Sequence, residues 1–230
     1  MRSLKKLEKG FTLIEMMVSL AVFSVVVTIS VGALLVLIAS NEQLQAEQGV
    51  MTNLSFALDS MTREMRTGTH YFCAGQPNYS AGGPEAIFDV SDSQEALGTS
   101  VNDCYDGKGG GERLHGVSFI EGGDSITAGI GTRILYYYDD LPLISGVSNP
   151  NYGKIMRRVG DNAAQPIISS GIHISNAEFF VSGPTLLSTG GVNSKDQASI
   201  TIFIEAQEVD DPTAKTYEIQ TTVTQRTLDI

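Results

Sequence analysis

Residues 11–39 read FTLIEMMVSLAVFSVVVTISVGALLVLIA, and this apolar stretch decides the fold of the N-terminal part of the chain. Its only charged residue is Glu15, and the 26 residues from Met16 to Asn41 carry no charge. A helix that spans a bilayer needs about 20 such residues. Helix is the expected state, because lipid cannot satisfy the hydrogen bonds of an exposed backbone.

The charges on either side of this stretch differ in sign. Residues 1–10 (MRSLKKLEKG) carry a net charge of +3, so the chain's total of −11 leaves −14 on residues 11–230. A basic stub favours a cytoplasmic N-terminus, with the rest of the chain across the membrane. The acidic body excludes nucleic-acid binding through a basic surface, so we predict no nucleic-acid partner.

Two ordinary interpretations account for the apolar stretch only in part. A secretory signal peptide has an apolar core of about 7–15 residues followed by a small-residue cleavage site, and this core is longer and lacks such a site. A plain membrane anchor explains the length and orientation. It does not explain a carboxylate, Glu15, at the fifth position of the apolar run.

The residues at the border, Lys9-Gly10-Phe11-Thr12-Leu13-Ile14-Glu15, resemble a prepilin peptidase recognition site. Such sites mark the type IV pilin and type II secretion pseudopilin superfamily. The resemblance implies cleavage between Gly10 and Phe11 and N-methylation of the new Phe11 amine. It also implies a structural subunit rather than an enzyme. The implied partners are prepilin peptidase, other pilin or pseudopilin subunits, an inner-membrane assembly platform and membrane lipid.

Glu15 is costly in a lipid-facing helix, by on the order of 2.5–3.5 kcal/mol or more. Cleavage after Gly10 would create a cation, the Phe11 amine, and Glu15 of one subunit could pair with that amine on a neighbour during assembly. The alternative is that Glu15 reaches the headgroups, because it lies near the cytoplasmic end. We expect this alternative in the isolated precursor.

The helix is predicted to continue past the membrane, because residues 41–67 contain no proline and one glycine, Gly49. Apolar residues recur there at helical spacing, at Leu44, Met51, Leu54, Leu58, Met61 and Met65. One helix of about 85 Å is therefore expected over 11–67, ended by Gly68. The domains become a leader (1–10), a membrane and assembly helix (11–40), an amphipathic helix (41–68) and an extracytoplasmic head (69–230).

The head is predicted to be rich in strands. The best pair, 198–208 and 215–224, alternates apolar and polar residues around a polar turn and predicts an antiparallel hairpin with one buried face. Further strands are expected at 116–120, 133–139, 154–159 and 171–181, whereas 69–132 is expected to be irregular, with a glycine-rich insertion at about 74–132. The fold class is α+β: a long helix whose apolar stripe covers an antiparallel sheet.

The two cysteines, Cys73 and Cys104, bracket the glycine-rich region. If the head is exported, an oxidising compartment favours a disulfide between them, which would contribute roughly 3–4 kcal/mol by closing the loop. Two reduced thiols are the alternative.

No catalytic motif stands out, and no cofactor is predicted. The three histidines, His70, His115 and His173, are scattered and are interpreted as surface or strand residues. Three loop acids offer the oxygen ligands that Ca²⁺ prefers but do not match an EF-hand, so solvated acids are the favoured interpretation: Asp103, Asp106 and Glu112.

Beyond the N-terminus, the order of elements resembles the J-type minor pseudopilin and the related W-type minor pilin. The segments that carry this resemblance are residues 54–66 (LSFALDSMTREMR), 133–138 (RILYYY), 154–158 (KIMRR) and 171–180 (GIHISNAEFF). It implies a minor subunit of a type IV pilus or type II secretion pseudopilus that acts near the tip or in assembly initiation. The alternative is a membrane-tethered extracytoplasmic binding module that does not polymerise.

Overall fold

The computed structural model describes residues 10–74, 115–123, 132–144, 146–160, 162–182, 197–209 and 215–226. One long helix, α1, spans Leu13–Thr67, and the strands follow it. Their bounds are β1 (Thr69–Ala74), β2 (Gly116–Ile120), β3 (Arg133–Asp139), β4 (Leu143–Ile144), β5 (Val147–Ser148), β6 (Lys154–Val159), β7 (Gln165–Pro166), β8 (Ile172–Ser182), β9 (Ser199–Glu208) and β10 (Tyr217–Thr224).

The chain divides into two compact units, Met1–Gln48 and Gly49–Ile230, and the division falls within α1. We call them the N-terminal unit and the head. In the head, α1 contributes a buried stripe at three- and four-residue spacing, as expected for an amphipathic helix. Leu54, Leu58, Met61 and Met65 are buried as predicted. The prediction is wrong for Leu44 and Met51, which are exposed. The buried residues are Val50, Leu54, Ala57, Leu58, Met61 and Met65.

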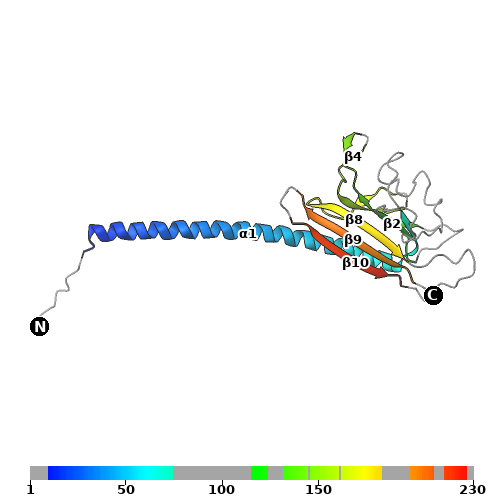
Figure 1. The fold of residues 1–230 in the computed structure, drawn as a ribbon, viewed down its shortest axis with the longest axis horizontal. Helices are drawn as coiled ribbons and strands as arrows, with labels where there is room; N and C mark the ends of the chain where they lie inside the picture. Colours follow the sequence, from blue (N-terminus) through cyan, green and yellow to red (C-terminus); the bar gives the residue numbers. More distant parts are fainter. Residues whose placement is uncertain are drawn as a thin grey trace, which may run out of the picture. The chain divides into compact units, whose positions relative to one another are not determined.

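The strands of the head form antiparallel sheets. Five strands pair in the order β1-β2-β3-β6-β7, three pair in the order β10-β9-β8, and β4 and β5 form a hairpin of their own. The part of α1 that belongs to the head runs alongside the three-stranded sheet (Figure 1). This arrangement confirms the predicted α+β class, with a helix packed on antiparallel strands.

The predicted hairpin is confirmed in strands and register. Ile200, Ile202 and Ile204 of β9 lie opposite Val223, Thr221 and Ile219 of β10. All three isoleucines are fully buried and belong to the same apolar core as the stripe of α1. Period-2 alternation therefore placed the correct face of the sheet against the helix.

The core continues into the five-stranded sheet, whose central strand β3 is buried along its whole length. Phe119 and Tyr136 stack with ring centroids 6.2 Å apart and lie in the core that includes α1. A smaller apolar cluster lies on the opposite face of the sheet, formed by Leu135 and Tyr137 of β3 and Met156 of β6.

Polar contacts also fix α1 to the five-stranded sheet. Glu64 accepts hydrogen bonds from Arg157 Nε and Nη2, at 3.0 and 2.9 Å, and from the Tyr136 hydroxyl at 2.7 Å. The helix ends as predicted before Gly68, where the Tyr71 hydroxyl donates to the carbonyls of Met65 and Gly68. These bonds satisfy carbonyls that the end of a helix leaves unpaired.

One part of the sequence prediction is wrong. The region expected to be irregular begins with a strand, β1, which pairs with β2 and starts directly after the helix. The left-handed backbone conformation at this junction occurs at His70 (φ 55°) rather than at a glycine. Gly68 is instead required by a close approach, because a Cβ there would lie 2.4 Å from the Phe119 ring.

Candidate processing and assembly site

The N-terminal end of α1 is closed by Thr12. Its carbonyl accepts hydrogen bonds from the backbone N–H groups of Glu15 and Met16, at 3.1 and 3.2 Å. Its hydroxyl oxygen also accepts from the Glu15 N–H, at 3.4 Å. Thr12 is therefore the N-cap, a position at which threonine is favoured because its side chain satisfies a free helix donor.

Glu15 completes the cap from the other side. Its Oε2 accepts hydrogen bonds from the backbone N–H and the hydroxyl of Thr12, both at 3.3 Å. Reciprocal bonds of this kind between a threonine and a glutamate three residues later form a capping box. The sequence analysis missed this partner of Glu15, although the spacing of Thr12 and Glu15 is the signal that indicates it.

The Gly10–Phe11 bond lies outside the helix. Gly10 and Phe11 precede the cap, have no regular secondary structure and are exposed, with Phe11 77% accessible. No atom lies within 4 Å of the position that a Cβ on Gly10 would occupy. The fold therefore has no steric need for glycine here.

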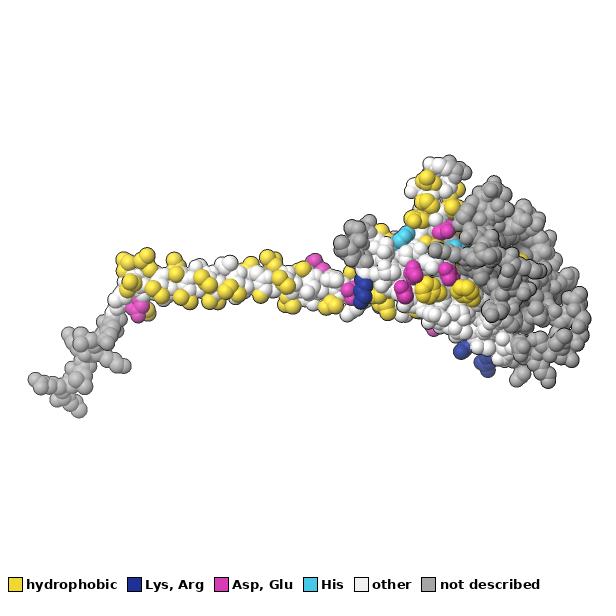
Figure 2. Space-filling view, viewed as in Figure 1, with side chains coloured by type: hydrophobic (Ala, Val, Ile, Leu, Met, Phe, Trp, Pro, Cys, Tyr) yellow, Lys and Arg dark blue, Asp and Glu magenta, His cyan; other side chains and the backbone are white. Residues whose placement is uncertain are grey.

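The apolar part of α1 has no partner within the N-terminal unit. Every residue from Gly10 to Gln45 is exposed, and apolar side chains cover this part of the helix (Figure 2). The most apolar 18-residue window has a mean hydropathy of 2.7, which fits a single-pass membrane anchor. A surface this apolar is stable in lipid or against other apolar helices.

The polar side chains within this apolar segment are satisfied by the helix itself. The hydroxyls of Ser19, Thr28 and Ser30 each donate to the carbonyl four residues earlier, at 2.7–2.8 Å, and Ser24 bonds to the carbonyl of Ala21. Such bonds lower the cost of placing hydroxyls in an apolar environment. Glu15 is then the only ionisable group between Phe11 and Asn41.

The structure brings no other predicted site together. Cys73 lies in β1, whereas Cys104 and the loop acids Asp103, Asp106 and Glu112 lie outside the described residues, so the disulfide and the calcium ligands stay predictions. No cluster of three or more potential metal ligands occurs in the described parts of the chain.

The three histidines lie apart in the head. His70 is in β1, His115 is buried directly before β2, and His173 is in β8 with its ring centroid 5.2 Å from that of Tyr152. Burial, together with the nearby positive charge of Arg133, lowers the pKa of His70. Arg133 donates to the His70 carbonyl at 3.2 Å, and burial lowers its own pKa to about 10.

Comparison with known proteins agrees with this geometry. A family model described as "Prokaryotic N-terminal methylation motif" matches residues 5–31, which include the exposed Gly10–Phe11 bond, the capping box and the start of the apolar helix. The motif indicates a prepilin-like N-terminus of the type IV pilin or pseudopilin kind. It implies cleavage by prepilin peptidase and assembly with other pilin subunits. No curated protein and no solved structure matches the chain.

Proposed function

We propose that this chain is a minor pilin or pseudopilin subunit of the J-type or W-type. It is cleaved between Gly10 and Phe11, N-methylated on Phe11, and assembled through residues 11–40 into a type IV pilus or type II secretion pseudopilus. The methylation motif at residues 5–31 carries the proposal. In this account the N-terminus is cytoplasmic and the head is extracytoplasmic, as the basic stub favours.

The local structure around the bond supports processing at this point. A protease needs an accessible backbone, and the capping box begins α1 just after the Gly10–Phe11 bond. The fold does not require a glycine at position 10. In this proposal, glycine is present there because prepilin peptidase needs a small residue before the bond that it cleaves.

Intact-mass analysis of the membrane form, from cells that contain prepilin peptidase, tests the cleavage. We expect a mature chain that begins at N-methyl-Phe11. Gly10→Val should block cleavage without unfolding the chain, because the site is open. Gly32→Ala is the matched control, since Gly32 is equally uncrowded and lies outside the cleavage site. A wild-type chain that keeps Met1 would contradict the proposal and leave a tethered binding module.

The role of Glu15 in assembly is tested separately from its role in the cap. Glutamine at position 15 can still accept hydrogen bonds from Thr12, but it cannot pair as an anion with the Phe11 amine of a neighbour. If charge pairing drives incorporation, Glu15→Gln should impair it about as strongly as Glu15→Leu does. Thr12→Val removes the cap's hydroxyl and keeps the charge, so it should incorporate more efficiently than either variant.

Filament fractions, compared with total membrane, report incorporation for each variant. Equal membrane insertion of all variants is expected, because the uncharged run from Met16 to Asn41 is unchanged. Normal incorporation of Glu15→Gln with failure of Glu15→Leu would show that the cap, rather than the charge, is what assembly requires.

The proposed export also predicts a Cys73–Cys104 disulfide in the head. Mass analysis after alkylation without reductant should find both thiols unreactive. Two alkylated thiols in the exported chain would show that the cysteines are reduced.

A further inference from the structure

The three-stranded sheet of the head ends at β10 (Tyr217–Thr224). β10 is its edge strand, and no described strand pairs with the other side of β10. β10 pairs with β9 over eight consecutive residues without a bulge, and it contains neither proline nor lysine. Exposed edges are ordinarily protected by bulges, prolines or lysines, because a bare edge offers its free N–H and C=O groups to another strand.

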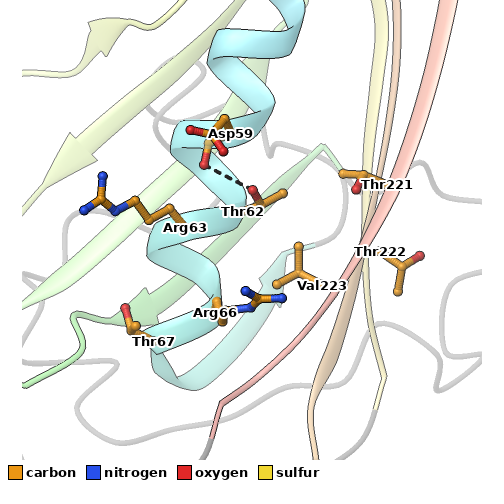
Figure 3. Close-up of a pocket in the computed structure, with 8 residues that line it drawn as sticks. All are labelled: Asp59, Thr62, Arg63, Arg66, Thr67, Thr221, Thr222 and Val223. Atoms are coloured by element: carbon orange, nitrogen blue, oxygen red, sulfur yellow. Dashed lines mark hydrogen bonds between the residues drawn. The ribbon is translucent and has the colours of Figure 1, made fainter.

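A groove runs beside this edge. It has a volume of about 380 Å³ and lies between the last turns of α1 and the C-terminal half of β10. Figure 3 shows the residues that line it: Asp59, Thr62, Arg63, Arg66, Thr67, Thr221, Thr222 and Val223. All belong to the head. Just after β10, the Arg226 N–H donates a hydrogen bond to the Arg66 carbonyl of α1, at 2.7 Å.

The helix side of the groove carries two arginines without a counter-ion. Neither Arg63 nor Arg66 forms an ion pair within the described residues. Asp59 is four residues before Arg63, at a spacing that permits a pair, yet its carboxylate makes none with it.

We propose that this groove is a docking site for an extended, acidic segment of a partner protein, which adds as a fourth strand to β10. The strand's backbone would pair with the free edge, as in β-strand addition. Its side chains on one face, about 6.8 Å apart, would present a carboxylate to Arg66. The Arg63 side chain points away from β10 in Figure 3, but it is exposed and can turn toward a second carboxylate. Guanidinium groups bind carboxylates through paired, charge-assisted hydrogen bonds.

A second copy of this chain fits the groove less well. A two-fold axis at the groove itself, near Thr222, would bring the arginines of both copies to the same junction, where like charges repel. An acidic strand instead neutralises them. The inference concerns the head alone and does not depend on cleavage or filament assembly, so the two can fail independently.

Fluorescence anisotropy with the full chain in detergent micelles tests the site. The probe is a labelled, end-blocked peptide in which glutamate alternates with threonine, and the control peptide has lysine in place of glutamate. We expect the acidic peptide to bind more tightly than the basic one, and its binding to weaken as salt is added. N-methylation of alternate amides on the pairing edge should abolish binding.

Substitutions in the groove should change the affinity for the acidic peptide in opposite directions. Replacing both arginines (Arg63→Gln with Arg66→Gln) should weaken binding about 2- to 30-fold, the range for two exposed ion pairs. Asp59→Asn removes a repelling carboxylate and should tighten binding. Lys215→Gln is the matched control, because Lys215 lies over the Tyr217 ring at the other end of β10, outside the groove.

Hydrogen exchange distinguishes strand pairing from charge attraction, because charge attraction alone would not protect backbone amides of β10. The bound peptide should protect outward-facing amides of β10 near Thr221–Val223. Equal binding of the acidic and basic peptides, unchanged binding by the double arginine variant, or no added protection in β10 would overturn the proposal. Self-association of the chain that the double variant abolishes would also overturn it, and would assign the groove to a second copy.

Discussion

The contact between Glu64 and the five-stranded sheet predicts a large loss of stability when the carboxylate is removed. Glu64→Ala deletes the acceptor of three hydrogen bonds, two from Arg157 and one from the Tyr136 hydroxyl. Tyr136 is fully buried, so its hydroxyl cannot turn to solvent. Burial, with the hydrogen bond and the charge of Glu64, raises the pKa of Tyr136, so the phenol stays a neutral donor.

The size of the expected loss in the free energy of unfolding follows from how exposed each partner of Glu64 is. A buried donor that loses its acceptor costs about 1–3 kcal/mol. The Arg157–Glu64 pair is about a third exposed on each side (31% and 28%), so it is expected to add only about 0.2–1 kcal/mol. Glu64→Ala should therefore lower the free energy of unfolding by roughly 1–4 kcal/mol. Glu64→Gln, which still accepts from Tyr136, should cost roughly 1 kcal/mol or less.

Urea unfolding of the full chain in micelles, followed by circular dichroism, measures these differences. Double-mutant cycles with Tyr136→Phe and Arg157→Met separate the energy of the Glu64–Tyr136 contact from that of the Glu64–Arg157 contact. Asp59→Ala is the control, because Asp59 is exposed on the same helix and its carboxylate forms no ion pair with a described residue of the head. A loss below about 0.5 kcal/mol for Glu64→Ala, the range of ordinary surface substitutions, would refute the reasoning.

Three further predictions concern the head, all measured by the same unfolding assay. Met61→Ala should cost about 2–5 kcal/mol because Met61 is fully buried, whereas Phe56→Ala, at a residue 73% exposed, should change stability by less than about 0.5 kcal/mol. Gly68→Ala should cost about 1–3 kcal/mol, because its methyl would overlap Phe119, and Phe119→Leu should restore part of the loss. Burial and a nearby lysine lower the pKa of His173, so protonation opposes folding. Stability should fall as pH drops below about 6.5, and His173→Gln should reduce this fall.

The parts of the fold that the sequence predicted have strong local patterns. Apolar spacing of three and four residues defined the buried stripe of α1, and alternation in β9 and β10 defined both their pairing and their buried face. β1 was missed because its short sequence, THYFCA, has no clear alternation and directly follows the helix. Its pairing with β2 is a long-range contact, which a local pattern does not specify.

The candidate site was predictable for the same reason. The motif around Gly10 and Phe11 is contiguous, and so is the apolar run that follows it. By contrast, the partners of Glu64 lie 72 and 93 residues away in sequence, and the groove beside β10 combines residues from both ends of the head. Such sites depend on tertiary packing, which no contiguous motif specifies.

Because of the capping box, the Glu15 carboxylate already has hydrogen-bond donors before assembly, and only a positive charge is missing. In the structure the carboxylate already has two donors from Thr12, and a cap of this kind is worth about 0.5–2 kcal/mol. A carboxylate held without a cation in lipid costs on the order of 2.5–3.5 kcal/mol or more, so the cap alone does not offset burial. Under the proposed mechanism, a neighbour's Phe11 amine would supply the missing positive charge. Because a carboxylate has two oxygens, one can keep its bonds to Thr12 while the other meets the amine. Capping and pairing would then act together, and the cap would hold Glu15 in place before its partner arrives.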